Sequence, residues 1–270
     1  MRTPIIAANW KMNKTIAEAI AFMEAFTPAV ADLTGVEAVI CPPFTALAAV
    51  GAKLGGIRPA FPSGAKLAMS SENAARVALG AQNMAKEAQG AFTGEISATM
   101  LKEVGVTYVV LGHSERRTLY AETDELVGAK VKAAFDAGLT PILCVGETLE
   151  EREDGLTDSV NKRQTLAGLA GLTADQVAKT VIAYEPVWAI GTGKNCGSGD
   201  ANTTIGAIRA VVAEAYGQSI ADQVRIQYGG SVKPNNIAEY MGQEHIDGAL
   251  VGGAALEAAS FAQICQGAKA

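Results

Sequence analysis

Short apolar runs alternate along the chain with longer segments whose apolar positions recur at helical spacing. Within each short run the apolar residues are consecutive, which is typical of strands that are buried on both faces of a parallel sheet. We therefore predict eight strands, at Pro4–Ala8, Val36–Cys41, Arg76–Gln82, Val106–Leu111, Leu139–Val145, Thr180–Tyr184, Val224–Tyr228 and His245–Val251.

A helical pattern follows each predicted strand. The predicted helices are Thr15–Leu33, Thr45–Leu54, Ile96–Val104, Asp124–Ala137, Leu149–Leu169, Asp200–Tyr216, Pro234–Met241 and Leu256–Gln266. Thr15 and Glu18 have the spacing of a capping box at the start of the first of these helices. Eight strand–helix pairs in 270 residues favour a closed (β/α)8 barrel over an open doubly wound sheet.

No domain boundary interrupts this alternation, so we predict a single barrel domain over residues 1–270. The segment Gly55–Ala75 is rich in glycine, proline and serine and fits no helix or strand. We expect it to be an insertion between the second helix and the third strand.

Composition excludes several classes of function. The formal net charge is −6, so we expect no nucleic-acid or anionic-membrane partner. The four cysteines have no C-x-x-C spacing and only two histidines occur, which argues against structural zinc and a disulfide framework and suits a reducing cytoplasm. The first residues do not read as a signal peptide, and no apolar run is long enough to span a membrane.

In a barrel of this kind the chemistry is carried by residues that follow the strands, at the C-terminal face. Lys11, His113 and Glu185 follow the first, fourth and sixth predicted strands. A carboxylate in such a position can take a proton from a carbon next to a carbonyl, while a neutral imidazole and an ammonium polarise that carbonyl. This chemistry requires neither a metal nor an organic cofactor.

Small residues make up the other half of the residues that follow the strands. Gly191, Ser231, Gly252 and Gly253 let backbone N–H groups approach a ligand closely, and helix N-termini there would hold a phosphate group. We therefore expect a small phosphorylated substrate to bind without a basic patch. The run Trp188–Lys194 has the composition of a lid, and its closure over Glu185 through Ile190 would desolvate the carboxylate and raise its pKa.

Each of these residues also has a plainer interpretation. A histidine after a strand is usually structural, Lys11 could be a solvated lysine, and Glu185 could be an ion-pair partner. We interpret His245 as a surface or strand-edge residue, Cys144 as a packed residue supporting the site, and Glu147–Asp154 as a solvated helix face. Two other functions also stay open: a Schiff-base aldolase, which would need a lysine inside the barrel, and a non-catalytic binding protein.

The motifs and their order along the chain favour one of these interpretations. NWKMN, AFTGEIS, GHSERR, CVGET, AYEPVWAIGTGK, YGGSV and LVGG cover most of the chain between Pro4 and Leu256. In this order they resemble the triosephosphate isomerases. The resemblance implies a cytoplasmic isomerase of glycolysis and gluconeogenesis, which interconverts glyceraldehyde 3-phosphate and dihydroxyacetone phosphate through an enediolate without a cofactor.

The resemblance also implies residue roles, which belong to the family and do not follow from the spacing. Glu185 matches the catalytic base, His113 a neutral electrophile that moves a proton between the substrate oxygens, and Lys11 a cationic electrophile. The other matched positions are Asn9 and Glu115 beside the lysine, Gly191, Ser231, Gly252 and Gly253 at the phosphate, and Ile190 and Leu250 as an apolar clamp over the base.

The resemblance further implies a homodimer. Thr93 would reach the partner's site beside Asn9 and Lys11, and Glu95 would face Arg116 across the interface. The segment Gly55–Ala75 is longer than the family pattern, and Asn195–Gly199 is richer in glycine than usual.

Overall fold

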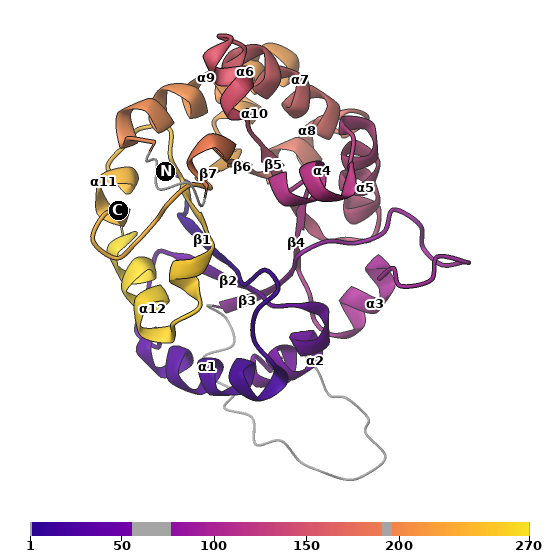
Figure 1. Ribbon diagram of the computed structural model, residues 1–270, viewed down its shortest axis with the longest axis vertical. Coiled ribbons are helices and arrows are strands. Elements are labelled where there is room, and N and C mark those ends of the chain that lie inside the picture. The colour runs from indigo at the N-terminus through magenta and orange to yellow at the C-terminus, as the bar shows by residue number, and fades with distance from the viewer. Residues whose placement is uncertain (1, 56–76, 191–195, 270) are drawn as a thin grey trace.

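Eight parallel strands form a closed barrel, with helices around it (Figure 1). The structure is a computed structural model that describes residues 2–55, 77–190 and 196–269. The strands pair in sequence order and β1 closes the ring against β8. They are β1 (Ile5–Asn9), β2 (Glu37–Cys41), β3 (Val77–Ala81), β4 (Tyr108–Leu111), β5 (Thr140–Val145), β6 (Val181–Tyr184), β7 (Arg225–Tyr228) and β8 (Gly248–Val251).

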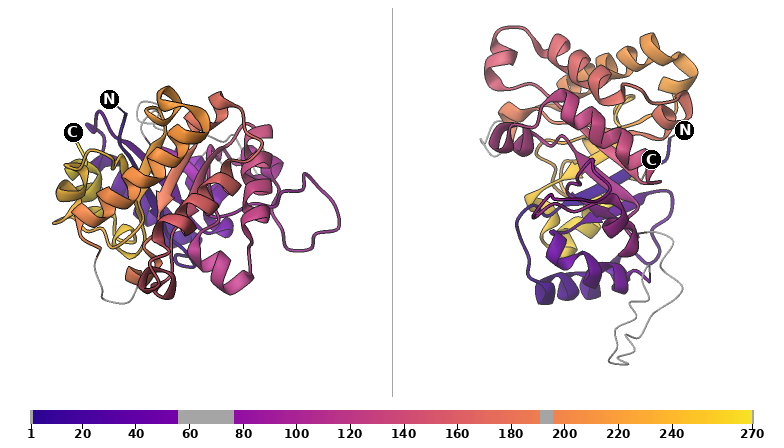
Figure 2. Two further views of the ribbon diagram at one scale, coloured as in Figure 1. Left: turned by 90° about the horizontal axis from the view of Figure 1, so that it is seen from above. Right: turned by 90° about the vertical axis from the view of Figure 1, so that its right-hand side faces the viewer.

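The helices pack on the outside of this ring in both perpendicular views (Figure 2). Within the described residues the α-helices are α1 (Ile16–Ala29), α2 (Phe44–Lys53), α3 (Ala98–Glu103), α4 (Ser114–Tyr120), α5 (Asp124–Asp136), α6 (Leu149–Glu153), α7 (Thr157–Leu169), α8 (Ala174–Lys179), α9 (Ser198–Tyr216), α10 (Gln218–Ala221), α11 (Ile237–Met241) and α12 (Ala258–Gly267). Two short 3₁₀ turns, η1 (Val187–Ala189) and η2 (Gly253–Ala255), follow β6 and β8.

Side chains alternate between two buried layers along each strand. In β1, Ile5 and Ala7 face the barrel interior, where they join Val110 of β4. Ile6 and Ala8 face outward and pack in the cluster beneath the helices. Because both faces of every strand are buried, the strands are apolar on consecutive residues, as the sequence pattern indicated.

The barrel architecture confirms the prediction from the sequence, and so does the capping box at Thr15 and Glu18. The element boundaries differ in part. The predicted helix Leu149–Leu169 is two helices, α6 and α7, separated at Gly155, which adopts a left-handed φ of 73°. The proposed insertion at 55–75 lies almost entirely outside the described residues.

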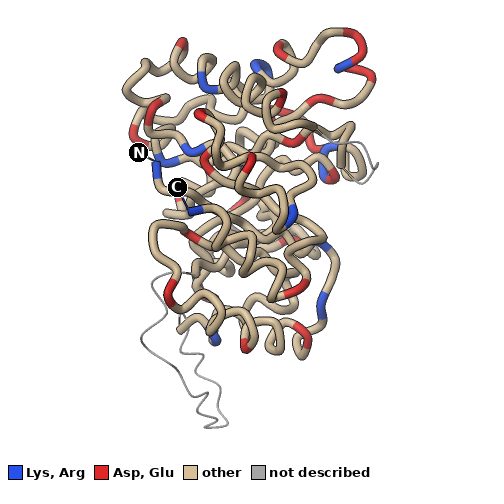
Figure 3. Tube along the Cα trace, turned by 90° about the vertical axis from the view of Figure 1, so that its left-hand side faces the viewer, with Lys and Arg blue, Asp and Glu red and all other residues tan. Residues whose placement is uncertain are grey.

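Charged residues are spread along the chain. Figure 3 shows acidic and basic positions interspersed along the described trace, with no basic stripe. No helix in the described residues combines the length and the apolarity that a membrane crossing requires.

Candidate active site

A cavity of about 760 Å³ lies at the C-terminal ends of the strands. Its wall combines ionisable side chains with glycines and small residues, as the pattern of strand ends predicted. The lining includes Asn9, Lys11, His113, Glu185, Ile190, Gly229, Gly230, Ser231, Leu250, Gly252 and Gly253. Residues that are widely separated in the sequence therefore meet around one pocket.

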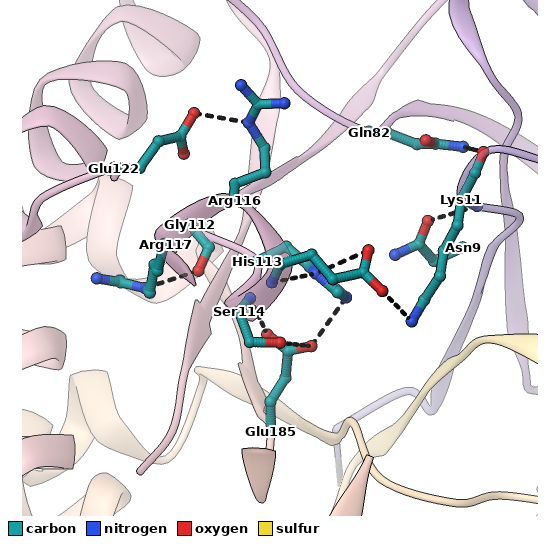
Figure 4. Close-up of polar contacts among 11 residues, drawn as sticks. Asn9, Lys11, Gln82, Gly112, His113, Ser114, Arg116, Arg117, Glu122 and Glu185 are labelled. Carbon is teal, nitrogen blue, oxygen red and sulfur yellow. Dashed lines mark hydrogen bonds and ion pairs between the residues drawn. The ribbon is translucent and has the colours of Figure 1, made fainter. Parts of the chain in front are cut away.

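Glu185 follows β6 directly and is only 2% exposed. Its backbone N–H donates to Val145 O of β5 at 2.7 Å, which fixes the main chain at the pocket wall. Its carboxylate accepts hydrogen bonds from the Ser114 N–H at 2.9 Å, the Ser114 hydroxyl at 3.4 Å and His113 Nε2 at 2.9 Å (Figure 4).

These contacts set the pKa of Glu185. Burial raises the pKa of this carboxyl, but the charge and hydrogen bond of His113, the Ser114 N–H and the more distant Lys11 together hold it below its usual value. The sequence led us to expect a carboxylate whose pKa rises when a lid covers it. In this arrangement burial is already nearly complete, and the pKa is lowered because the hydrogen bonds favour the charged form.

His113 caps the N-terminus of α4. Its Nδ1 accepts a hydrogen bond of 3.2 Å from the Glu115 N–H, so the proton of the neutral ring lies on Nε2, which faces Glu185. Burial lowers the pKa of this imidazole and Lys11 adds to that effect, but the Glu185 carboxylate raises it and prevails. The position of the proton therefore depends on whether Glu185 stays in contact.

Lys11 approaches from the opposite side of the pocket. Its backbone has a left-handed φ of 52°, which is unusual for a residue with a side chain. The conformation is held by Asn9 Oδ1, which accepts from the Lys11 N–H at 3.0 Å, and by Gln82 Nε2, which donates to Lys11 O at 2.9 Å. The ammonium lies 2.6 Å from Glu115 Oε1.

The remaining wall is made of backbone. A Cβ atom at Gly229 would lie 2.9 Å from Glu185 Cγ, and one at Gly230 would lie 2.1 Å from the Tyr228 hydroxyl oxygen, so both positions require glycine. Gly252 and Gly253 precede and begin η2, and a Cβ atom at Gly252 would lie 3.6 Å from Lys11 Cε. Backbone N–H groups at a helix start and a lysine side chain thus share one end of the pocket, which suits an anion.

Comparison with known proteins agrees with this geometry. The model of the family "Triosephosphate isomerase" matches residues 4–268. The chain is 61% identical to a triosephosphate isomerase of Symbiobacterium thermophilum over 268 residues, covering 99% of this chain and 98% of the relative. It is 56% identical to the enzyme of Clostridium perfringens over 98% of this chain and 99% of the relative. For the enzyme of Carboxydothermus hydrogenoformans the identity is 52%, over 99% of both chains.

The chain belongs to the triosephosphate isomerase family. The site residues expected of a triosephosphate isomerase fall into three groups here. Asn9, Lys11, His113, Glu185, Ile190, Ser231, Leu250, Gly252 and Gly253 line the pocket. Glu115 and Cys144 lie behind it, against Lys11 and Glu185 respectively. Gly191 lies outside the described residues.

The positions assigned to a triosephosphate isomerase dimer lie away from the pocket of their own chain. Thr93 and Glu95 belong to an exposed loop between β3 and α3 that projects from the barrel in Figures 1 and 2. Arg116, on α4, donates to Glu122 Oε1 at 2.6 Å and stacks on Tyr120.

One interpretation of the sequence was wrong. Glu147 was assigned to a solvated helix face, yet it is 0% exposed. Its carboxylate accepts from the Tyr184 hydroxyl at 3.0 Å, Trp188 Nε1 at 2.9 Å and Asn161 Nδ2 at 3.1 Å. The carboxylate therefore anchors the segment that follows Glu185. The signal available in the sequence was the position of Glu147 two residues after a strand end, as for Lys11 and His113.

The sequence reading also assigned no role to Ser114. It occurs in the motif GHSERR, but a serine after a histidine carries no distinctive signal by itself. The short helix α4 places its N–H and hydroxyl against Glu185. Since α4 was not predicted, the contact between Ser114 and the carboxylate was not foreseen.

Proposed function

We propose that Glu185, His113 and Lys11 carry out the interconversion of glyceraldehyde 3-phosphate and dihydroxyacetone phosphate, the reaction of the family to which the chain belongs. The observation that carries this proposal is the shared pocket. A carboxylate, an imidazole and an ammonium face the same cavity from three strand ends, and the backbone of Ser231, Gly252 and Gly253 forms its other wall.

The phosphate group of the substrate would bind at the glycine wall. The N–H groups at the start of η2 point to an anion site, and the nearby Lys11 side chain adds positive charge. Holding the phosphate there directs the three-carbon chain toward His113 and Glu185. The acidic net charge of the chain is no obstacle, because the attraction is local.

Glu185 would act as the base. It leaves its contacts with Ser114 and His113, takes a proton from the carbon next to the carbonyl, and returns that proton to the adjacent carbon. The C–H electrons pass into an enediolate, whose oxygens are stabilised by His113 Nε2 and the Lys11 ammonium. Because Ser114 and His113 hold the carboxylate in the charged form, Glu185 is ready to accept a proton on arrival.

His113 would transfer the second proton between the two substrate oxygens. The Glu115 N–H at Nδ1 supports the neutral ring with its proton on Nε2. When Glu185 moves to the substrate, the carboxylate that raises the pKa of His113 departs, and burial and Lys11 then favour the neutral form. Neither step requires a metal or an organic cofactor, and we propose that none is used.

We also propose that the protein acts as a homodimer in the cytoplasm. Large apolar side chains are exposed on three segments: Phe92, in the projecting loop, is 44% exposed, Met100, on α3, 54%, and Met12, after β1, 95%. Side chains of this kind are enriched at subunit interfaces. Thr93 follows Phe92 in this loop and is itself exposed, which supports a role in contacting a partner. The four cysteines are free and buried, which suits a reducing compartment.

An assay coupled to a dehydrogenase specific for one of the two triose phosphates tests the proposed function. We expect turnover of the purified protein in the presence of a metal chelator. Glu185→Gln should lower kcat by roughly three orders of magnitude while KM changes little, because the amide cannot take the proton. Glu24→Gln, an exposed carboxylate on α1, is the matched control and should leave kcat unchanged. Near-normal turnover of Glu185→Gln would refute the role of the base.

A further inference from the structure

Arg117 makes three contacts at the base of the site. Its Nε donates to Gly112 O at 2.7 Å, and its Nη2 donates to Cys144 O at 3.2 Å. Its Nη1 donates at 2.5 Å to Oδ1 of Asp124, which is the first residue of α5. One guanidinium thus joins the ends of β4 and β5 to the N-terminus of α5, a use of the fixed fork of donors that only arginine offers.

The first of these contacts lies one residue from His113. At Gly112 the chain leaves β4 with a left-handed φ of 70° and turns so that His113 caps α4. A Cβ atom at Gly112 would lie 3.0 Å from Arg117 Nη2 and 2.7 Å from Val127 Cγ1, so the turn is packed against the guanidinium. Figure 4 shows the bond between Arg117 and Gly112 beside His113.

The second contact lies beside the proposed base. Cys144 is fully buried. Burial is the main cause that raises the pKa of its thiol, and the charge and hydrogen bonding of the Glu185 carboxylate raise it further. The two side chains therefore lie within contact range. Arg117 therefore ties the strand that presents His113 to the strand that packs against Glu185. A change in the Arg117 contacts would shift the imidazole relative to the carboxylate.

We infer that Arg117 is a positioning residue for His113, holding the Gly112 turn so that Nε2 faces the substrate carbonyl. The inference rests on the proposed function, since it is the proton transfer through His113 that requires this alignment. Arg117 is absent from the pocket lining and touches no reacting atom. Misplacing a reacting group by about 1 Å can cost on the order of 100-fold in rate, so a loss of positioning should be measurable.

The test is a double-mutant cycle of Arg117→Lys with His113→Gln. A lysine keeps the positive charge, but its single ammonium nitrogen cannot reach the two carbonyl oxygens and the carboxylate that the three guanidinium nitrogens of Arg117 contact. We expect Arg117→Lys to lower kcat roughly 10- to 100-fold with His113 present and less than about 3-fold in the His113→Gln background, with KM nearly constant in both. A purely structural role would cost the same factor in both backgrounds, and that result, or no loss of kcat at all, would overturn the inference.

Two further variants keep the test decisive. If Arg117→Lys does not fold, Asp124→Asn takes its place in the cycle, because it leaves the arginine but removes the carboxylate that orients it. Arg163→Gln is the control, since Arg163 donates to the other oxygen of Asp124 at 2.9 Å but is exposed and reaches neither strand. It should keep kcat within about 2-fold of the unaltered protein.

A spectroscopic measurement separates this inference from the proposed function. The NMR chemical shifts of the imidazole nitrogens of His113 report its hydrogen bonds, whether or not the protein turns over triose phosphates. Absence of isomerase activity in the unaltered protein would refute the proposed function alone. Unchanged His113 shifts in Arg117→Lys would refute the positioning role.

Discussion

His113 Nε2 lies 2.9 Å from Glu185 Oε1, so the proposed acid and base are in direct contact in the wall of the pocket. Each partner acts on the other: Glu185 raises the pKa of His113, and His113 lowers that of Glu185 against the opposite effect of burial. A substrate that enters between them replaces this contact. The pair is therefore a source of pH-dependent stability.

Removing His113 should change the pH dependence of stability. A raised pKa in the folded protein contributes stability that is fully present below the unfolded value of 6.5 and is lost as the pH rises through the folded pKa. The free energy of unfolding should therefore fall more steeply above pH 6.5 in the unaltered protein than in His113→Gln, by at most about 1.4 kcal/mol per pH unit, the slope of one proton. Urea denaturation between pH 6 and about 9 measures both slopes.

The slope alone is compared, because His113→Gln also removes a helix cap and lowers stability at every pH. His245→Gln is the control: this histidine packs against Gly206 of α9, away from the pocket. Parallel curves for the unaltered protein and His113→Gln would contradict the assignment.

A carboxylate at the glycine wall should repel the substrate phosphate. A Cβ atom at Gly253 meets no other atom within 4 Å, so a side chain there fits without disturbing the fold. We expect Gly253→Asp to raise KM for both triose phosphates at least about 10-fold, because it places a negative charge where the phosphate would bind. Steady-state kinetics in both directions measure this effect.

Inorganic phosphate provides an independent readout of the same wall. It should inhibit the unaltered protein competitively and inhibit Gly253→Asp far more weakly. Gly253→Ala, which adds a methyl group without charge, should stay within about 3-fold of the unaltered KM if repulsion is the cause. An equal rise of KM in both variants would mean that bulk, and not charge, is responsible.

The sequence predicted the architecture and the contents of the pocket because both depend on local signals. Consecutive apolar residues in β1 and β6 mark strands buried on both faces, and a parallel barrel brings all its strand ends to one face. Once Lys11, His113 and Glu185 were each placed after a strand, their convergence followed from topology alone.

The contacts between strand ends could not be predicted in the same way. The buried carboxylate of Glu147 begins a sequence that is otherwise charged and solvated, so composition pointed to the surface. The partners of Glu147, Tyr184 and Trp188, come from the next strand and the turn that follows it. Such hydrogen bonds depend on side-chain orientation in three dimensions, which no periodicity records.

A charge in the projecting loop should dissociate the proposed dimer. Phe92→Asp replaces a half-exposed aromatic ring next to Thr93 by a carboxylate, which would be costly to bury in an interface. We expect sedimentation equilibrium to give a dimer for the unaltered protein and a monomer for the variant at micromolar concentration, with a kcat at least about 10-fold lower. Leu166→Asp, at a partly exposed position on α7, which Figure 1 shows apart from the projecting loop, should remain dimeric. A monomeric unaltered protein with full activity would contradict the role of Thr93 in a partner's site.

Removing one partner of the buried ion pair between Glu122 and Lys130 should strongly destabilise the protein. Lys130 Nζ donates to Glu122 Oε1 at 2.6 Å and to Asn83 Oδ1 at 2.9 Å, and both charged side chains are buried. Glu122→Gln leaves a buried ammonium without its counter-charge, so we expect a loss of about 3 kcal/mol in the free energy of unfolding at pH 7. The exposed pair Lys132–Asp136, whose charged atoms lie 2.9 Å apart, is the control, and Asp136→Asn should cost about 0.5 kcal/mol or less.

The pH dependence of this loss identifies its cause. Burial raises the pKa of Glu122, but its hydrogen bonds with Lys130 and Arg116 outweigh burial and lower it. A lowered pKa gives stability that is present above the unfolded value of 4.5 and is lost as the pH falls through the folded pKa. The difference in unfolding free energy between the unaltered protein and Glu122→Gln should therefore shrink below pH 4.5, because the protonated carboxyl and the amide are then alike in charge. A difference that stays constant into acid would show that lost packing, and not the ion pair, destabilises the variant.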